Sequence, residues 1–467
     1  MPQNANTLHL LWAGLLQVAT VLGVLLALLL IARALRSPRK PATSLSWIFI
    51  IMFMPVLGIP LYLTFGERKL NTLMKRKTKI DLPDTHDSHQ HPLHSLLVAL
   101  GIPSSSADNR VRFHADGKAA YRELLLLIEG AQRSIDIAMY LLAADAVGRT
   151  IITALENKAA QGLKVRLLLD GVGSINLPKT ALSTFLSYGG QLAWFIPVIH
   201  WPLRGKTNLR NHRKFIIVDH EKVWTGGRNF ASTYLGPDCP AGCWIDLSFT
   251  QHGSVASTYR SIFDADWRFA TDCPTEQIQP VTVATSGGQS RVQVIPSGPD
   301  VADDPIYAVI LSACYEAHRR IRIVTPYYVP DTGVQEALKL AALRGVLVDL
   351  ILPGRSNHRL ADFARNRYLR ELAAAGVRIW FLPNIMVHAK ALVVDSIFAM
   401  AGSTNLDIRS LFLNCEVMSG FYSEKDIEWL SQWLEALRER SVRHYPQPVG
   451  ALKEMLEGVT LLGAYQL

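Results

Sequence analysis

Two short runs of the sequence carry the same side chains at the same spacing. Each run has a histidine, a lysine two residues later and an aspartate after a further apolar stretch. The two sets are His212, Lys214 and Asp219 in NHRKFIIVD, and His388, Lys390 and Asp395 in VHAKALVVD. On an extended strand, positions i and i+2 share a face, so the histidine and lysine of each set project together. One such pair is expected by chance, but two copies indicate a shared cause.

The chemistry that these residues favour is phosphoryl transfer. If the two copies pack about a pseudo-twofold axis, their histidines and lysines meet in one pocket. A neutral imidazole can attack phosphorus, and a protonated one can protonate a departing alkoxide. The lysines and the amides of Asn229 and Asn405, which follow the two motifs, would hold the non-bridging phosphate oxygens.

The aspartates at the end of each motif are less suited to this chemistry. They stand seven residues after the histidines, where the strand ends or the side chain points to the other face. We expect them to fix the turn and the neighbouring chain. The motifs contain no carboxylate cluster of the kind that binds Mg²⁺, so we predict neither a metal nor a cofactor.

Length and composition limit the setting of this site. A chain of 467 residues is long enough for two core-forming units. Its hydrophobic fraction of 49% and charged fraction of 19% indicate membrane segments beside an ordinary core. The net charge of +9 favours an anionic partner, and nucleic acid, anionic lipid and phosphorylated substrates all fit it.

The five cysteines are scattered along the chain. Cys239 and Cys243 form a CPAGC pair, but no second pair with zinc-site spacing accompanies it. We expect free thiols in a reducing compartment.

The N-terminus favours a membrane anchor over residues 1–70. Leu10 to Ala32 are 23 residues without a formal charge, and a helix of this length spans about 35 Å. A cleaved signal peptide would need a basic start and a shorter apolar run. A second apolar stretch, 45–65, contains Pro55, Gly58 and Pro60, and either a second span or a re-entrant hairpin fits it.

Basic residues follow the second apolar stretch closely. They are Arg68, Lys69, Lys75, Arg76, Lys77 and Lys79. Because cytoplasmic flanks of membrane segments are rich in Lys and Arg, this cluster predicts that the large C-terminal region is cytoplasmic. Residues 33–40, between the two apolar stretches, are also basic. Two full spans would place this loop and the later basic cluster on opposite sides of the membrane. A re-entrant hairpin would leave both on the same side.

Beyond a polar linker, 71–110, the chain repeats a pattern of elements. Helix-to-strand segments begin at Tyr121 and Tyr307, and each is followed by a helical stretch, a glycine and an apolar strand. The His-Lys-Asp runs come next, each ending in a Gly-rich turn, TGGRN or AGSTN. This alternation predicts an α/β fold with two similar domains, 111–280 and 293–467.

The repeated pattern HxK(x)4D, followed by GGxN or GSxN, resembles the phospholipase D superfamily. With PVLGIPLYLTFG near the N-terminus and GSTNLDIRSLFLNCEV after the second motif, nearly the whole chain resembles the bacterial cardiolipin synthases. The resemblance implies two phospholipase D-like α/β/α-layered domains, related by pseudo-twofold symmetry, behind an N-terminal α-helical anchor in the bacterial inner membrane. It also implies a phosphate contact from Ser403, on one side only, because Gly227 stands at the matching position of the first copy.

The resemblance further implies the transfer of a phosphatidyl group between two phosphatidylglycerol molecules, which releases glycerol. By family habit His212 is the nucleophile and His388 the acid/base, although the sequence does not fix this order. The partners implied are anionic phospholipid and the membrane, while a phosphatidylethanolamine co-substrate and a homo-oligomer stay open. A phosphodiesterase or nuclease is the alternative, but no dedicated nucleic-acid module is present, so we expect no nucleic acid partner.

Two carboxylates outside the motifs complete the predicted site. Glu416 stands 28 residues beyond His388, and Asp246 stands 34 residues beyond His212. A buried apolar strand rarely carries an unpaired acid, so each needs a partner, either an arginine, a backbone amide or a motif histidine. Family resemblance favours the histidines. Pairing with an acid would favour the protonated imidazole, and the lysines would oppose this protonation. The pair could then share one proton near neutral pH.

The C-terminal tail, residues 448–467, is apolar enough to lie on a bilayer, and docking onto the protein fits it equally well.

Overall fold

The computed structural model describes most of the chain after residue 90. The described ranges are 80–83, 91–196, 209–237, 242–271 and 287–462, with a few positions before residue 80. Within these ranges no helix is both long and apolar enough to cross a membrane. The predicted anchor, 1–70, including the choice between span and hairpin at 45–65, falls almost entirely outside the described residues.

The chain forms two compact units. One contains Met1–Leu73 and Ile199–Asn208, and the other contains Met74–Val198 and Leu209–Leu467. Apart from residues 199–208, both predicted α/β domains lie in the second unit, which holds everything described below.

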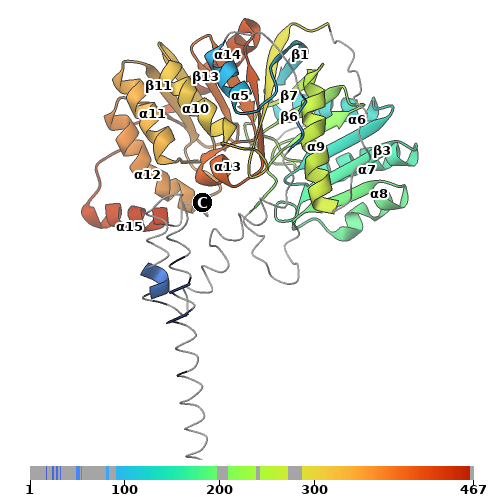
Figure 1. Cartoon of the computed structure of the whole chain (residues 1–467), viewed down its shortest axis with the longest axis horizontal. Coiled ribbons are helices and arrows are strands. Elements are labelled where there is room, and N and C mark those ends of the chain that lie inside the picture. The colour runs from blue at the N-terminus through green and yellow to red at the C-terminus, as the bar shows by residue number, and fades with distance from the viewer. Residues whose placement is uncertain are drawn as a thin grey trace, which may run out of the picture. The chain divides into compact units, whose positions relative to one another are not determined.

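The first half of this unit, coloured blue-green to yellow-green in Figure 1, alternates strands and helices. Its strands are β1 (Ser106–His114), β2 (Ser134–Met139), β3 (Lys164–Asp170), β4 (Gln191–Phe195), β5 (Phe215–Val218), β6 (Lys222–Gly226) and β7 (Ser248–His252). Its helices are α6 (Gly117–Glu129), α7 (Ala146–Ala160), the 3-10 turn η1 (Lys179–Leu182), α8 (Ser183–Ser187) and α9 (Val255–Thr271).

The second half repeats this order with additions. Its strands are β8 (Ser290–Ser297), β9 (Arg320–Val324), β10 (Tyr328–Val329), β11 (Leu347–Pro353), β12 (Arg378–Leu382), β13 (Ala391–Val394), β14 (Phe398–Gly402), β15 (Leu406–Asp407), β16 (Glu416–Phe421) and β17 (Val442–His444). Its helices are α10 (Pro305–Glu316), α11 (Thr332–Leu343), α12 (Arg359–Ala374), α13 (Ile408–Phe412), α14 (Glu424–Glu439) and α15 (Ala451–Leu462), and α5 (Pro92–Ala99) packs on α10.

One continuous sheet joins the halves, in the order β17-β12-β11-β9-β13-β14-β16-β8-β1-β7-β6-β5-β2-β3-β4. Outside the extra edge strand β17, this order reads the same from the centre outwards in both directions. The antiparallel pair β1–β8 lies at the centre, with Ser106 opposite Val292. Such a palindromic order is what a pseudo-twofold axis through β1 and β8 produces. The predicted α/β architecture of two related halves is confirmed.

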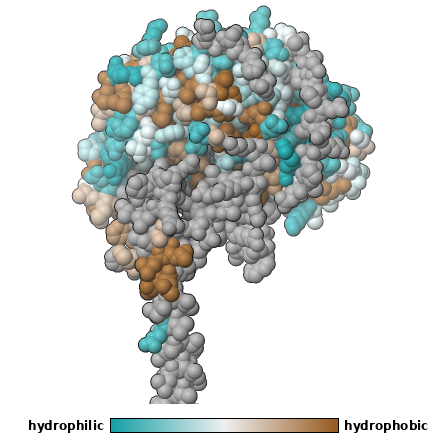
Figure 2. All heavy atoms as spheres, viewed as in Figure 1, coloured by the Kyte–Doolittle hydropathy of each residue, from teal (hydrophilic) through white to brown (hydrophobic). Residues whose placement is uncertain are grey.

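The local sequence explains the elements around the site. The parallel strands β3 and β11 read KVRLLLD and LVDLILP and are buried after their first residue, as expected for strands covered by helices on both faces. Gly162 and Gly345, which precede them, adopt φ of +84° and +91°, a conformation that ends a helix and that glycine adopts without strain. Each half has its own apolar core. The face in view mixes hydrophilic and hydrophobic atoms (Figure 2).

Two expectations fail outside the site. The linker predicted for 71–110 contains α5 and the start of β1. Pro92 opens α5, and His94 is buried and accepts a hydrogen bond from the Ser105 amide at 3.1 Å. The cysteines are not all free thiols, because Cys243 is disulfide-bonded, whereas Cys314 and Cys415 are free and buried.

Candidate active site

Both motif histidines lie just before a strand, not within it. His212 and Lys214 precede β5, and His388 and Lys390 precede β13. These two extended segments are held by the opposite half of the unit. The His212 amide donates to the Cys415 carbonyl at 2.9 Å, and the His388 amide donates to the Ile245 carbonyl at 2.7 Å. Each motif histidine is therefore hydrogen-bonded to the residue that directly precedes an acid of the other half, Glu416 or Asp246.

This exchange of segments pairs the side chains crosswise. Nδ1 of His212 lies 2.9 and 3.0 Å from the two carboxylate oxygens of Glu416, which belongs to the second half. Nδ1 of His388 lies 2.7 Å from Oδ2 of Asp246, which belongs to the first half. The expected contact of each acid with a motif histidine is present, and both acids are fully buried. With Nδ1 held, Nε2 of His212 is left for chemistry, whereas Nε2 of His388 lies 3.1 Å from the Lys390 amine.

The lysines lie against their own histidines but make different contacts. Lys214 donates to the His212 carbonyl at 2.8 Å. The Lys390 amine lies 2.8 Å from Nδ1 and 3.1 Å from Nε2 of His388 and also donates to the His388 carbonyl. Aromatic rings border both sites: Tyr140 packs edge-on against His212 at 4.9 Å between centroids. Tyr234 packs in the same way on His388 at 5.0 Å.

Burial dominates the protonation of the imidazoles. Burial lowers the pKa of His212 to about 4, with Lys214 adding to this effect and Glu416 opposing it. Burial and Lys390 lower the pKa of His388 to about 3 against the pull of Asp246. Both rings are thus neutral near pH 7 in the free protein. The direction of both shifts opposes the expected sharing of one proton near neutrality, because the desolvation of a buried cation exceeds the attraction of the acid.

The acids and Lys390 respond to the same surroundings. Burial alone would raise the pKa of Asp246, but Lys390, His388 and Arg228 outweigh it and lower the pKa to about 2. The pKa of Glu416 is also lowered, because His212 and its neighbours overcome the effect of burial. Burial lowers the pKa of Lys390 to about 8. Two carboxylates and a protonated amine therefore surround two neutral imidazoles.

The two asparagines occupy matching positions. Both are buried, and the side-chain amide of Asn229 donates to Tyr234 while that of Asn405 donates to Asp407. Among the described residues, the Oδ1 atom of each asparagine has no partner. Each side-chain amide can therefore make at least one further hydrogen bond.

Ser403 does not fit its predicted contact with phosphate. Its hydroxyl donates to Oε2 of Glu416 and accepts from the Val417 amide at 3.0 Å, so its hydrogen is already used. At the matching position in the first half, a Cβ on Gly227 would lie 2.2 Å from Oδ1 of Asp246. The halves thus differ because serine supports Glu416 where glycine makes room for Asp246.

Asp219 and Asp395 hold the chain as expected and do not reach the histidines. The carboxylate of Asp219 accepts the amides of Gln132, Arg133 and Ser134 at 2.7 to 3.2 Å. That of Asp395 accepts three amides, from 318 to 320, at 2.6 to 2.9 Å. In each half, this bond set ties the end of the motif strand to the start of its neighbour, β2 or β9.

Comparison with known proteins identifies the arrangement. A family model described as "Cardiolipin synthase, PLD-like domain" matches residues 124–267 and 310–438, one match in each half. A cardiolipin synthase of Geobacillus sp. (strain WCH70) is 32% identical over 429 residues, which cover 87% of this chain and 85% of the relative. The chain belongs to the cardiolipin synthase family of the phospholipase D superfamily. The resemblance inferred from the motifs is confirmed.

Other likenesses agree with this membership. A cardiolipin synthase of Clostridium perfringens (strain SM101 / Type A) is 30% identical over 408 residues, 83% of this chain and 85% of the relative. A second family model, "Phospholipase_D-nuclease N-terminal", matches residues 25–67. The crystal structure of phosphatidylserine synthase from Haemophilus influenzae Rd KW20 has a TM-score of 0.58 at 14% identity, covering 85% of this chain and 99% of that one. At that identity the likeness shows the shared fold.

Sequence reasoning missed a buried arginine between the first histidine and lysine. Arg213 is fully buried and pairs with Asp266 at 2.7 Å and Asp300 at 3.0 Å. Its Nε also donates to the backbone carbonyl of Glu416 at 3.1 Å. The second motif has Ala389 at the matching position. This charged residue, present in one motif and absent from the other, was the signal in the sequence that could have identified Arg213.

This arginine also bears on metal binding. Among the described residues, Asp266, Asp300 and Cys415 have ligand atoms within 4.8 Å of one another. The guanidinium of Arg213 bonds to both carboxylates. Because this cation already supplies the positive charge that the acids require, the cluster is better explained as a buried ion-pair group than as a metal site.

Proposed function

We propose that the protein joins two phosphatidylglycerol molecules into cardiolipin and releases glycerol. The observation that carries this proposal is the crossed site, in which two histidines from a duplicated motif each bond to a buried acid of the other half. Membership of the cardiolipin synthase family supplies the class of reaction. The geometry supplies the two bases that a two-step transfer needs.

In the first step Nε2 of His212 attacks the phosphorus of one phosphatidylglycerol. A P–N bond forms, the P–O bond to the head-group glycerol breaks, and His388 gives a proton to the departing oxygen. In the second step His388 takes the proton from a head-group hydroxyl of the second phosphatidylglycerol. That oxygen attacks phosphorus, the P–N bond breaks and cardiolipin leaves, with both histidines restored.

The difference between the two halves supports this division of roles. Glu416 is fixed by Ser403 as well as by His212, which favours a ring held rigidly for attack. His388 touches the Lys390 amine, a group with a pKa of about 8 that is charged at pH 7. A neighbouring proton donor suits the residue that must gain and lose a proton.

The charge of the substrate explains how His388, whose pKa is low in the free protein, can become protonated. The phosphate of a bound lipid is anionic, and it offsets the lysine charges that contribute to lowering the imidazole pKa. His388 is therefore protonated more readily with lipid bound than in the free protein. Lys214, Lys390 and the side-chain amides of Asn229 and Asn405 bind the non-bridging oxygens in this proposal, and their fixed positions lower the cost of charge in the transition state.

The N-terminal segment anchors the enzyme in the bacterial inner membrane in this proposal. The uncharged run from Leu10 to Ala32 carries it, together with the family model that matches residues 25–67. The basic cluster after residue 67 favours a cytoplasmic position for the catalytic unit. The disulfide at Cys243 is typical of an oxidising compartment and argues the other way. Accessibility in intact cells decides between them.

The test uses the full-length chain in mixed micelles with phosphatidylglycerol as the lipid. Mass spectrometry should find cardiolipin and an equal amount of glycerol, and His212→Ala or His388→Ala should remove both. Phosphatidic acid and glycerol without cardiolipin would mean hydrolysis instead of transfer. Cleavage of single-stranded DNA in a parallel reaction, without lipid turnover, would favour a nuclease.

A further inference from the structure

The C-terminal helix α15 is docked through a buried carboxylate, that of Glu457. Glu457 is fully buried and forms an ion pair with Arg370 of α12, on which α15 packs. The guanidinium of Arg370 also lies 3.3 Å from the second carboxylate oxygen. A helix on the surface of a soluble protein normally buries its apolar stripe and exposes its charges. In the described part of α15 one charged side chain, Glu457, is buried, while Lys453, Glu454 and the apolar residues Leu452, Met455 and Leu456 are exposed.

The apolar side chains of α15 form an exposed stripe. Leu452, Met455 and Leu456 stand at helical positions i, i+3 and i+4, so they share a face. They are 69%, 62% and 50% exposed. Three neighbouring large apolar residues facing water indicate a surface that is covered in use.

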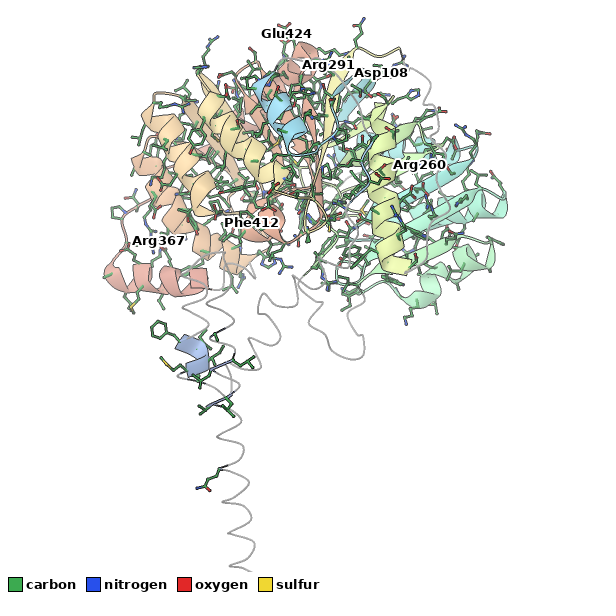
Figure 3. The ribbon with its side chains drawn as sticks, in the orientation of Figure 1. Asp108, Arg260, Arg291, Arg367, Phe412 and Glu424 are labelled. Atoms are coloured by element: carbon green, nitrogen blue, oxygen red, sulfur yellow. The ribbon has the colours of Figure 1, made fainter. Side chains whose placement is uncertain are left out.

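Cations border this stripe. Lys453 is exposed on the helix itself, and Arg367 of α12, labelled in Figure 3, lies beside α15. A Cβ on Gly458 would come within 3.8 Å of the Arg367 guanidinium. Arg359 is exposed at the start of α12 next to Leu360, which is 62% exposed. Two acids lie among these cations: Glu454 is exposed on the helix, and Glu371 of α12 pairs with Arg367 at 3.5 Å.

We propose that α15 lies in the surface of a bilayer containing anionic phospholipid and holds the catalytic unit against its substrate. The stripe enters the boundary between head groups and acyl chains, to a depth of about 5–10 Å, and the neighbouring cations meet the head-group phosphates. This inference rests on the proposed function, because the substrate is then a component of that bilayer.

A second copy of the chain fits the stripe less well. A stable protein interface buries roughly 800 Å² on each partner, and three side chains on one helix are far too few for that. A bilayer needs no matching shape and accepts a narrow apolar ridge. Bordering cations would repel the same cations of a second copy in a symmetric contact, whereas they attract anionic head groups.

The position of α15 suits this role. In Figure 1, α15 lies toward the same lower side of the unit as α13, the short helix that starts three residues after Asn405.

The first experiment measures depth in the bilayer. Met455→Cys in the full-length chain carries a fluorescent probe, and quenching by doxyl-labelled lipids is compared in vesicles of phosphatidylcholine alone and of equimolar phosphatidylcholine and phosphatidylglycerol. Glu424→Cys, at the opposite end of the unit in Figure 3, is the matched control. The unsubstituted chain, labelled in parallel, gives the background from native cysteines.

Strong quenching at 455, little at 424, and an increase with phosphatidylglycerol is the expected result. No quenching at 455, or equal quenching at both positions, would overturn the proposal. A disulfide crosslink between the unlabelled cysteines at 455 of two chains, together with no quenching of the labelled protein, would identify a second copy as the occupant. This result would also overturn the proposal.

The second experiment separates the helix from the chemistry. The triple variant Leu452→Ser, Met455→Ser, Leu456→Ser should lose about tenfold in turnover of vesicle lipid, since it removes one of two membrane contacts. Its turnover of short-chain, water-soluble phosphatidylglycerol should equal that of the unaltered protein. Leu126→Ser, an exposed leucine of α6 in the other half, should change neither.

The two proposals fail in different ways. Absence of cardiolipin from both lipid forms with the unaltered protein would refute the proposed function. Unaltered turnover of vesicle lipid by the triple variant would refute the role of α15 alone. A loss on both lipid forms in the triple variant would also refute it, because docking on a bilayer is not needed for soluble substrate.

Discussion

Replacing Glu416 with glutamine tests the crossed pairing most directly. The carboxylate is fully buried, accepts from Nδ1 of His212 at 2.9 and 3.0 Å, and accepts the hydroxyl of Ser403. A glutamine has the same shape and can keep one bond to Nδ1 and the contact with Ser403, while the second Nδ1 contact is lost because it would face NH₂. Its carbonyl accepts from Nδ1, its NH₂ donates to Ser403, and the Ser403 hydroxyl turns to the Val417 carbonyl, which is 3.2 Å away. The fold should therefore survive.

What Glu416→Gln removes is charge. Hydrogen bonds to charged groups contribute about 1.5–3 kcal/mol and neutral ones about 0.5–1.5 kcal/mol. The difference, about 1–2 kcal/mol, should appear when positive charge develops on His212 as it attacks phosphorus. This corresponds to a loss of about 5- to 30-fold in kcat.

Ser403 should decide how large the loss becomes. In a serine protease triad, an amide in place of the acid costs about 10⁴-fold, because the histidine is held in the wrong tautomer. Here Ser403 accepts the NH₂ group and keeps the carbonyl toward His212. Ser403→Ala combined with Glu416→Gln removes that restraint, so the amide can turn and the loss should approach the larger figure.

The assay is single-turnover formation of cardiolipin, followed by mass spectrometry, with thermal unfolding of each variant as the control for folding. Ser403→Ala alone supplies the fourth corner of the double-mutant cycle. Activity of Glu416→Gln within about twofold of the unaltered protein would refute the argument, because the expected loss is at least about 5-fold. A double variant no slower than Glu416→Gln would show that Ser403 does not orient the group.

Four further predictions follow from the same contacts. His212→Ala and His388→Ala should each abolish transfer and the double variant should lose nothing more, as residues of one site behave; substantial turnover in either single variant would break the one-site model. Because the folded pKa values of these histidines, about 4 and about 3, lie below the ordinary 6.5, the unfolded chain takes up protons first as pH falls. Each histidine should then cost about 2 kcal/mol of stability by pH 5, and urea unfolding of His212→Gln/His388→Gln should show a flatter decline between pH 7 and 5. Arg213→Met should destabilise the fold by about 3–5 kcal/mol, since it leaves buried carboxylates unpaired, and adding Asp266→Asn should recover part of this in urea titrations. Glu424→Cys should react with a membrane-impermeant reagent only after cell lysis, and reaction in intact cells would place the unit outside.

Much of the architecture could be predicted because it is written in local order. The duplicated motif, the glycines at 162 and 345 and the apolar strands at 164–170 and 347–353 recur in the same sequence along both halves. Periodicity and turn residues act within a few positions of the chain, so they indicate α/β layers and two related units. The failures at 91–110 have a similar origin, because Pro92 and the polar residues around it read equally well as a linker and as a helix start.

The partners of the site residues are a different matter. His212 and Glu416 are 204 positions apart, and His388 and Asp246 are 142 apart. The sequence shows that each acid needs a partner, because a buried charge is costly, but each acid follows the motif of its own half. The palindromic sheet joins the halves through β1 and β8. Backbone hydrogen bonds from the two histidines to Cys415 and Ile245 then place each acid beside the histidine of the other half.

The sequence by itself determined which side chains do the chemistry, that they occur twice, and which family they define. Only the tertiary structure decided the crossed pairing and the outward turn of the apolar stripe on α15. The structure also shows that the Ser403 hydroxyl donates to Glu416 and that Arg213 pairs with both Asp266 and Asp300. The physical reason is that periodicity assigns a residue to a face of its own element, whereas its partner depends on which distant element packs there. Burial then sets protonation, which no spacing along the chain can express.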